Sequence, residues 1–415
     1  MNIIIHRGAK EIGGSCVEII SAGERILIDL GLPLDAGEND KKYLPNVSGL
    51  DGKDKFLLCV IISHPHLDHF GLISHISAQL PVIMGKDARR IITAAAPFMP
   101  GNQKPPADGL NLENEIPFTI GPFKITPYLM DHSGYDAYSL MIEADGKRVF
   151  YSGDFRTHGR KAKLTNKLID NPPKDIDVLL MEGTSLARIN DDVVFPKESE
   201  IEEQFREVFE KTKGISLVHT SAQNIDRIVS IFRACKKSKK TLVLDLYSAA
   251  ILEATGNENI PQSDWPKIAV YIPQSQRVMI LKRKWFDLLE RHSKNRIFIE
   301  NMQEIASDYV MLFRGLHIRD LTKAGLTKDA VYIYSQWEGY WEREEFRYIR
   351  EWIKEQDIPK INIHTSGHAS PSDLKKYADA INPKRLIPIH TFEPEKYKEL
   401  FRNVEIYLDG EVIEV

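Results

Sequence analysis

Short apolar runs separated by turn residues dominate residues 1–185 and predict a domain built mainly from β-strands. Two longer stretches, 71–79 and 87–98, have the spacing of amphipathic helices. Asp145 and Gly146 separate two of the apolar runs and predict a tight hairpin turn. Many strands with few helices are typical of a layered, sheet-based domain. The strands predicted here are 2–5, 16–20, 25–30, 56–63, 81–84, 118–129, 138–144, 148–152 and 177–181.

The pattern changes near Pro196. Residues 198–213 are charged and periodic, which predicts a surface helix. From there to about residue 340, helical stretches alternate with short apolar runs, which is typical of βαβ units and a parallel sheet. After a helix predicted over 346–356 the chain returns to strands, and Asp409-Gly410 predicts a closing hairpin. The strands expected in this half are 215–219, 241–246, 331–334, 360–364, 386–390, 404–408 and 411–415.

Composition describes an ordinary globular protein. The chain has 415 residues, of which 42% are hydrophobic and 27% charged, and this excludes a disordered or fibrous chain. At roughly 150 residues per domain, this length predicts about two to three domains. The net charge of -4 does not by itself suggest a nucleic-acid partner, since domains that bind nucleic acids tend to be basic.

Neither secretion nor membrane insertion is expected. The longest apolar run, 56–62, is far shorter than the roughly 20 residues that a spanning helix needs, and the N-terminus has no signal-peptide pattern. The three cysteines, Cys16, Cys59 and Cys235, cannot build a disulfide framework in so long a chain and are expected to be reduced. We therefore expect a cytoplasmic protein. The chain ends directly after its last predicted strand, so no C-terminal appendage is expected.

Four potential metal ligands, His64, His66, Asp68 and His69, lie directly after the predicted strand 56–62. Side chains two residues apart leave an extended segment on the same side, so the first two imidazoles are expected to point together. A strand end followed by a helix start is a rigid place from which to direct ligands. Imidazole nitrogen and carboxylate oxygen together suit Zn²⁺ or Mn²⁺.

Three further candidate ligands, His132, Asp154 and His390, each follow the carboxyl end of a predicted strand. Ligands collect at such ends in layered sheet proteins. The full set is enough for two metal ions, with three histidines for one ion, Asp68 and two histidines for the other, and Asp154 bridging them. We expect two divalent ions per chain, zinc first, with manganese as the alternative.

These residues resemble the metallo-β-lactamase superfamily. The pattern His-x-His-x-Asp-His at 64–69, followed by a single His and by Ser-Gly-Asp at 152–154, is similar to the family's metal-binding motifs. Asp29, in Ile-Asp-Leu-Gly, resembles the family's first motif, an Asp that supports the site. The resemblance implies an α/β fold in the form of a four-layer αββα sandwich, with the metals at one edge of its two sheets.

Later motifs resemble the β-CASP nucleases of this superfamily, and ribonuclease J most of all. Met-Glu-Gly-Thr at 181–184 resembles their motif A, His-Thr-Ser-Gly-His-Ala-Ser at 364–370 their motif B, and Ile-His at 389–390 their motif C. The loop at 8–16 is also similar to the polyadenylation-cleavage branch. The resemblance implies a metallo-β-lactamase domain in two parts, 1–195 and 351–415, with a β-CASP α/β domain inserted at 196–350.

The resemblance implies a ribonuclease that hydrolyses RNA phosphodiesters with a hydroxide shared by two metal ions. It implies contact with the scissile phosphate and a general-acid role for His368, whose imidazole titrates in a suitable range. Glu182 would orient His368 or a ligand histidine through a hydrogen bond. Cleavage inside the RNA chain, from its 5′ end, or both, is compatible with these motifs.

Two groups of small polar residues are candidate phosphate contacts. Ser366, Gly367 and Ser370 in motif B would form a cradle in which backbone amides and hydroxyls approach an anion. Ser221 and Asn224 open a predicted helix, where they are either plain N-cap residues or, as the resemblance implies, neighbours of a terminal phosphate.

The chain departs from the ribonuclease J pattern in two ways. Pro65 and Leu67 stand where that family usually has Gly and a polar residue, so the direction of the ligands is expected to differ. The chain also lacks that family's usual C-terminal domain, which assists dimer formation there. The oligomeric state therefore stays open.

A basic stretch favours a nucleic-acid partner in spite of the net charge. Residues 231–300 contain 13 Lys and Arg and 7 Asp and Glu, a balance of +6, with dense runs at 236–240 and 282–284. Trp285, Trp337 and Trp341 are candidates for base stacking. We expect single-stranded RNA as the partner. The alternatives are a DNA nuclease, a small-molecule hydrolase and a non-catalytic scaffold. The histidine at motif C, His390, favours RNA over DNA as the substrate. The presence of all seven candidate metal ligands disfavours a scaffold that has lost catalysis.

Overall fold

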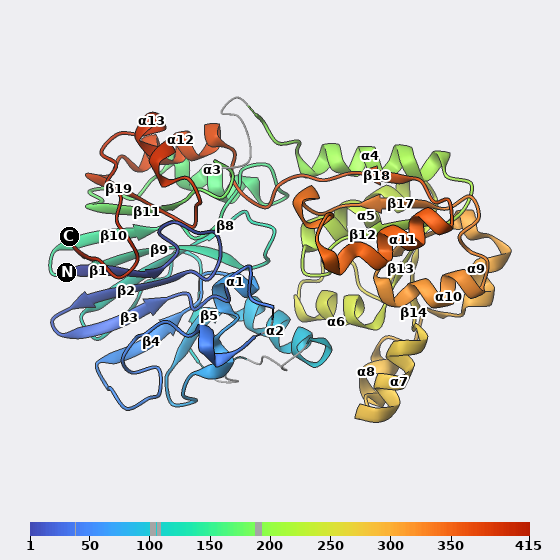
Figure 1. The fold of residues 1–415 in the computed structure, drawn as a ribbon, viewed down its shortest axis with the longest axis horizontal. Coiled ribbons are helices and arrows are strands. Elements are labelled where there is room, and N and C mark those ends of the chain that lie inside the picture. The colour runs from blue at the N-terminus through green and yellow to red at the C-terminus, as the bar shows by residue number, and fades with distance from the viewer. Residues whose placement is uncertain (38, 100–104, 106–108, 187–192) are drawn as a thin grey trace. The chain divides into compact units, whose positions relative to one another are not determined.

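The computed structural model describes residues 1–37, 39–99, 105, 109–186 and 193–415, which form two compact units (Figure 1). Unit 1 comprises Met1–Phe195 and Gly367–Val415, and unit 2 comprises Pro196–Ser366. The second part of unit 1 begins at Gly367, whereas the sequence predicted that it begins at residue 351. The reason is that the segment before it supplies a helix and an edge strand to the parallel sheet of unit 2.

Unit 1 contains two mixed sheets. The order of the first is β20-β1-β2-β3-β4-β5-β6, and that of the second is β19-β11-β10-β9-β8-β7. The first sheet is formed by β1 (Asn2–Arg7), β2 (Cys16–Ser21), β3 (Glu24–Ile28), β4 (Leu57–Ile61), β5 (Val82–Gly85), β6 (Asn111–Leu112) and β20 (Val412–Glu414). The second is formed by β7 (Phe118–Ile120), β8 (Phe123–Met130), β9 (Ala137–Ala144), β10 (Lys147–Tyr151), β11 (Val178–Glu182) and β19 (Arg385–Ile389).

Alternating side chains build the layers of unit 1. On β3, Ile26 and Ile28 face the core between the two sheets, while Leu27 faces the opposite way, toward the helices of the first sheet. On β10, Tyr151 faces the inner core and Phe150 faces helices on the other side. The predicted four-layer αββα sandwich is confirmed. The helices of unit 1 are α1 (Leu67–Phe70), α2 (Lys86–Ala95), α3 (Ala162–Asp170), α12 (Pro371–Ile381) and α13 (Tyr397–Leu400), with 3-10 turns at Lys41–Tyr43, Ile73–His75, Ala96–Phe98 and Pro394–Lys396.

Unit 2 is a sheet whose recorded strand pairs are all parallel, in the order β15-β14-β13-β16-β12-β17-β18, as the βαβ pattern predicted. Its strands are β12 (Ser216–His219), β13 (Thr241–Leu244), β14 (Ile268–Tyr271), β15 (Arg296–Ile297), β16 (Tyr309–Leu312), β17 (Val331–Tyr334) and β18 (Lys360–Asn362). Its helices are α4 (Glu198–Lys211), α5 (Ile225–Lys237), α6 (Leu246–Ala254), α7 (Gln274–Arg283), α8 (Phe286–Arg291), α9 (Ile299–Glu304), α10 (Ile318–Lys323) and α11 (Arg347–Glu355), with 3-10 turns at Ala306–Asp308, Gly315–His317, Glu338–Tyr340 and Glu344–Phe346.

Trp341 packs in the core on one face of this sheet, so it is not available for base stacking. The three cysteines of the chain are free and buried, as expected. Within the residues that the structure describes, no helix has both the length and the apolar character needed to cross a bilayer.

Two local predictions are wrong. The helix predicted at 71–79 is replaced by the short α1 and a 3-10 turn, because the amide of Leu72 donates to the carbonyl of Leu30 instead of continuing a helix. The predicted hairpin at Asp409-Gly410 does not form. The last strand, β20, pairs with β1, and the amide of Gly410 donates to Ile5.

The topology brings several strand ends to one edge of unit 1. Strands β10, β11 and β19 are parallel neighbours, so the residues that follow them emerge together. The segment after β3 lies against α1 through hydrogen bonds of Leu30 and Leu32 to the carbonyls of His69 and Leu67. Gly31, between them, has no room for a side chain, because a Cβ there would lie 1.7 Å from the carbonyl oxygen of Asp68.

Replacing Gly31 with Ala is therefore expected to force α1 away from the sheet. We expect a loss of about 3 kcal/mol or more in the free energy of unfolding, measured by urea titration. Gly37→Ala is the matched control, since a Cβ at that position meets nothing within 4 Å. Equal stability of the two variants would contradict this packing argument.

Candidate metal centre

The structure brings the predicted ligands together at the edge where the strands of unit 1 end. Each comes from a segment whose direction is fixed by the sheet or helix beside it, and all except Asp68 and His66 are at most 3% exposed. The ligands are His64 and His66 after β4, Asp68 and His69 on α1, His132 after β8, Asp154 after β10 and His390 after β19.

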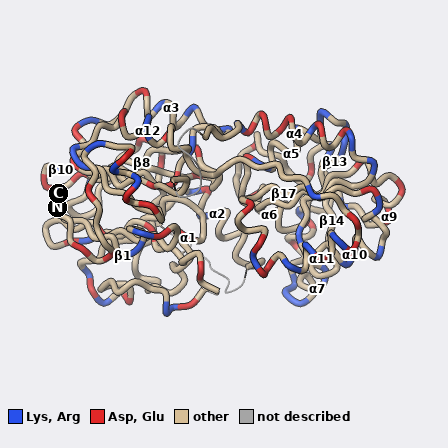
Figure 2. Tube along the Cα trace, turned by 45° about the horizontal axis from the view of Figure 1, so that its top comes forward, with Lys and Arg blue, Asp and Glu red and all other residues tan. Residues whose placement is uncertain are grey.

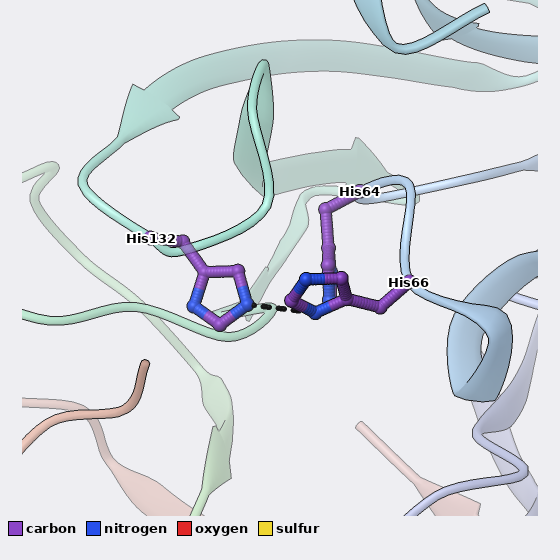
Figure 3. A group of neighbouring side chains, drawn as sticks. All are labelled: His64, His66 and His132. Carbon is purple, nitrogen blue, oxygen red and sulfur yellow. Dashed lines mark hydrogen bonds between the residues drawn. The ribbon is translucent and has the colours of Figure 1, made fainter. Parts of the chain in front are cut away.

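His64, His66 and His132 form the first ligand group, with ligand atoms that all lie within 4.8 Å of one another (Figure 3). The Nε2 of His132 lies 3.1 Å from the Nδ1 of His66. Zinc–nitrogen bonds of about 2.0–2.1 Å in a tetrahedron place two nitrogens roughly 3.3 Å apart, so this spacing fits two ligands of one ion. Gly134 lies over all three rings, and a Cβ there would be 3.3 Å from each.

Asp68, His69 and His390 form the second ligand group. The Oδ2 of Asp68 lies 4.0 Å from the Nε2 of His69 and 3.7 Å from the Nε2 of His390. Asp154 faces both groups with one oxygen. Its Oδ2 lies 3.6 Å from His64 of the first group, and 3.2 Å and 3.7 Å from the two histidines of the second. A carboxylate in this place is positioned to be shared between two ions.

Several of these ligand atoms make no hydrogen bond. They are the Nε2 atoms of His64, His69 and His390 and the Oδ2 of Asp154, all buried. Leaving a buried polar atom unsatisfied costs about 1–3 kcal/mol each, so a structure rarely retains four of them side by side. Divalent cations satisfy all four at once. The donor types, the spacing and the unsatisfied atoms together fit two divalent ions.

Asp29 holds one ligand of each group without being a ligand itself. Its Oδ2 accepts from the Nδ1 of His69 at 2.7 Å and from the hydroxyls of Tyr151 and Ser63 at 2.7 and 2.8 Å. The Oγ of Ser63 in turn lies 3.0 Å from the Nδ1 of His64. Both imidazoles are thus oriented with Nε2 toward the metal positions. Asp29 has a left-handed backbone (φ 61°), which costs about 1–3 kcal/mol at such a residue.

The N-terminal loop holds His390. Its Nδ1 lies 2.8 Å from the Oγ of Ser15, and its amide donates to the carbonyl of Gly8. His390 also has a left-handed backbone (φ 51°). The sequence did not predict the role of Ser15, and it missed Ser63 and Tyr151. Only Ser63, directly before His64, had a local signal.

Burial and charge set the protonation of the ligands. Burial lowers the pKa of His66 to about 4, and it also lowers the pKa values of His64, His132 and His390, which keeps these imidazoles neutral as metal ligands must be. Burial acts in the same direction on His69, but Asp154, Asp29 and Asp68 together raise its pKa well above the ordinary value.

The carboxyl of Asp154 is kept ionised. Burial favours its neutral form, but the facing imidazoles of His390, His69 and His368 outweigh burial and hold the pKa well below the ordinary value.

His368 lies beside both groups and is partly open to solvent. Its Nδ1 is 3.1 Å from the Oε2 of Glu182 and 3.7 Å from the Oδ2 of Asp154, and its side chain is 21% exposed. Glu182 is buried and accepts from the amides of Phe155 and Thr184. Glu182 therefore fixes the orientation of the imidazole ring of His368.

The predicted phosphate contacts differ in their surroundings. Ser370 caps α12, because its Oγ accepts from the amide of Asp373. Gly367 packs against the Ser133 hydroxyl in the loop after His132, and a Cβ there would lie 2.5 Å from it. Ser366 is the last residue of unit 2. The phosphate role of all three stays a prediction.

Ser221 and Asn224 lie at the start of α5 in unit 2. Ser221 accepts from the amide of Gln223, and Asn224 caps the helix through Arg227. The basic run 236–240 lies at the other end of the same helix, about 20 Å away at 1.5 Å per residue. The helix start and the lysine run therefore cannot contact the same phosphate group.

Comparison with known proteins gives the family. A family model described as a beta-lactamase superfamily domain matches residues 24–243, and one described as a Zn-dependent metallo-hydrolase RNA specificity domain matches residues 360–406. An "RNase J-like protein" of Methanocaldococcus jannaschii is 31% identical over 189 residues, covering 43% of this chain and 41% of the relative.

Two further relatives, both named "Ribonuclease J", match more of the chain at lower identity. That of Sinorhizobium meliloti is 21% identical over 88% of this chain and 63% of its own length. That of Mycoplasma genitalium is 23% identical over 92% of this chain and 66% of its own length. This chain thus spans about two fifths to two thirds of the length of these relatives.

The fold also matches a solved structure. A crystal structure of a protein of unknown function from Enterococcus faecalis V583 has a TM-score of 0.80 and 22% identity, and the match covers 99% of each chain. The first family model covers more than half of the residues and includes most of the ligand positions. The chain therefore belongs to the metallo-β-lactamase superfamily, carries the RNA specificity domain of its Zn-dependent hydrolases, and is a distant homologue of ribonuclease J.

Proposed function

We propose that the chain is a ribonuclease that hydrolyses RNA phosphodiesters with two divalent ions, zinc first. The observation that carries the proposal is the single Oδ2 of Asp154, which faces histidines of both ligand groups. The match to an RNA specificity domain and the ribonuclease J relatives support RNA as the substrate. We assign residues 196–366 to an inserted domain of the β-CASP type.

Two divalent ions held by these residues would supply a hydroxide at neutral pH and would stabilise negative charge on a phosphoryl oxygen. The protein's own residues supply the remaining requirements. Asp154 lies between the two ligand groups and faces histidines of both. Asp29 fixes the tautomer of His69 directly and that of His64 through Ser63. Burial keeps water away from most of the ligands, and His66, Asp68 and His368 are the partly exposed members of the site.

His368 is the proton donor for the leaving oxygen in this proposal. Glu182 lies 3.1 Å from its Nδ1 and would stabilise a protonated imidazole, whose proton could then pass to a substrate oxygen. Glu182 is thus a positioning residue that acts through His368, and not a catalytic one.

The direct test of the function offers 5′-labelled RNA and DNA of one sequence, each with a monophosphate or triphosphate end, with the bound metals quantified in the same preparation. We expect RNA to be cleaved in preference to DNA by a preparation that holds zinc. Mononucleotides from the monophosphorylated RNA would indicate a 5′ exonuclease, and internal fragments an endonuclease. Equal cleavage of DNA, or no cleavage of either polymer, would overturn the proposal.

Replacing Asp154 with Ala is expected to abolish cleavage, because it removes the carboxylate whose Oδ2 faces both ligand groups. Circular dichroism should show a retained fold, and metal analysis should show fewer ions per chain. Asp177→Ala is a control, since Asp177 is a buried carboxylate that pairs with Lys384 at the far end of β11. Full activity of the Asp154 variant would contradict the two-metal site.

Asp29→Ala is expected to weaken metal binding about 10–100-fold, since Asp29 orients one ligand of each group without touching a metal position. Competition with a chelating dye measures the affinity. Tyr151→Phe, which removes one hydrogen bond to Asp29 and keeps the carboxylate, should have a smaller effect. An unchanged metal affinity in the Asp29 variant would contradict the prediction, because it would mean that His64 and His69 keep their orientation without Asp29.

His368→Ala is expected to lower kcat about 10²–10⁴-fold while the chain retains its full complement of metal ions. Glu182→Gln should lower kcat less and should shift the limb of the pH–rate profile that reports the acid. If His368→Ala instead loses a metal ion, the imidazole is a ligand, together with Asp154 and Glu182, and the general-acid assignment is wrong.

A further inference from the structure

Helices α7 and α8 of unit 2 form a hairpin whose turn is rich in cations and apolar side chains. α7 ends at Arg283, Lys284 follows with a left-handed backbone (φ 55°), and α8 begins at Phe286. Figure 1 shows the two helices side by side below β14, extending away from the parallel sheet of the unit. The function proposed above does not use this hairpin.

Three consecutive cations, Lys282, Arg283 and Lys284, are exposed at the turn. In Figure 2 the Lys and Arg colour gathers beside the α7 label. Arg283 lies over the ring of Trp285, with 5.1 Å between the guanidinium carbon and the ring centroid. Within the described ranges, neither lysine belongs to an ion pair. The negative carboxyl end of α7 favours cations at this turn.

The same turn exposes large apolar side chains. Leu281 is 67% exposed and Phe286 is 51% exposed, and Val278 lies one turn earlier on α7 at 39%. Exposed apolar side chains that gather in one place, rimmed by polar residues, are typical of contact surfaces. The acidic residues nearby, Asp287 and Glu290, belong to α8, and Asp287 lies in its first turn, where a carboxylate favours the helix.

An exposed aromatic ring beside a run of cations suits one kind of partner well. Single-stranded nucleic acids stack their bases on aromatic side chains while their phosphates contact Lys and Arg. A second copy of this chain would meet the same three cations and would be repelled, and an uncharged apolar segment would leave the cations without partners. Charge complementarity therefore favours a polyanion with flat bases over either of these partners.

We propose that the α7–α8 turn, residues 281–286, is a docking surface for single-stranded RNA, with Phe286 stacking on a base and Lys282 and Lys284 contacting phosphates. The choice of RNA among polyanions rests on the function proposed above.

The test measures binding of a fluorescein-labelled single-stranded RNA of about 20 nucleotides, long enough for several stacking contacts, by anisotropy. The full chain is used in an Asp154→Ala background, so that the RNA is not cut during the measurement. Phe286→Ala is expected to weaken binding about 10-fold. Lys282→Gln with Lys284→Gln is expected to make the slope of log K against log salt shallower by about 1.4, since each phosphate contact of a single strand contributes about 0.7.

Two matched controls test whether the effects are specific to the α7–α8 turn or follow from losing any exposed aromatic ring or any two positive charges. Phe298 is a similarly exposed phenylalanine of unit 2, at 48%, and Arg296 lies over its ring, so Phe298→Ala should leave binding unchanged. Lys323→Gln with Lys328→Gln removes the same charge from other exposed positions of unit 2 and should leave the salt slope unchanged. Equal effects of hairpin and control variants would overturn the proposal.

Two outcomes point to other partners and would also overturn it. If light scattering finds a dimer that Leu281→Ser and Phe286→Ala dissociate, the turn is an interface between copies. If an acidic peptide competes with RNA for the turn but not for the rest of the chain, the partner is a protein. A chain that cleaves no RNA but binds it through this turn would retain the docking surface and lose the proposed function.

Discussion

The buried carboxylate of Asp154 faces four imidazoles across 3.2–3.7 Å and has an oxygen that no hydrogen bond satisfies. A buried charge is costly unless something pairs with it. Burial lowers the pKa values of His64 and His390, whereas the nearby carboxylates raise that of His69, so only part of the missing positive charge comes from imidazoles. Divalent cations would supply the rest, and the positions of the other site residues fit this requirement.

The fold provides the rigidity that this requirement needs. Three parallel neighbouring strands, β10, β11 and β19, end at one edge of the sheet, where Asp154, Glu182 and His390 lie. The segment after β4 carries His64 and His66. Close backbone contacts then fix the remaining freedom. Gly31 allows α1 to lie against the segment after β3, and Gly134 allows a loop to cover three imidazole rings. The left-handed backbones of Asp29 and His390 show that the site is assembled at a cost in local strain.

Most of the ligand set could be predicted from the sequence because each ligand follows an apolar strand, and strand ends are visible as a local pattern. The residues that orient the ligands were harder to find. Ser15 and Tyr151 reach His390 and Asp29 from segments 375 and 122 residues away, and no local pattern reports such distances. The predicted helix at 71–79 was wrong because a tertiary hydrogen bond of Leu72 replaced a helical one. The predicted return of the chain at 351 was too early, since the edge strand β18 completes the sheet of unit 2.

Anomalous diffraction at the zinc absorption edge from crystals of the zinc-loaded protein tests the account most directly. The account predicts two peaks, one bounded by His64, His66 and His132 and one by Asp68, His69 and His390, with the carboxylate of Asp154 between them. A single peak, or two peaks that Asp154 does not join, would contradict it.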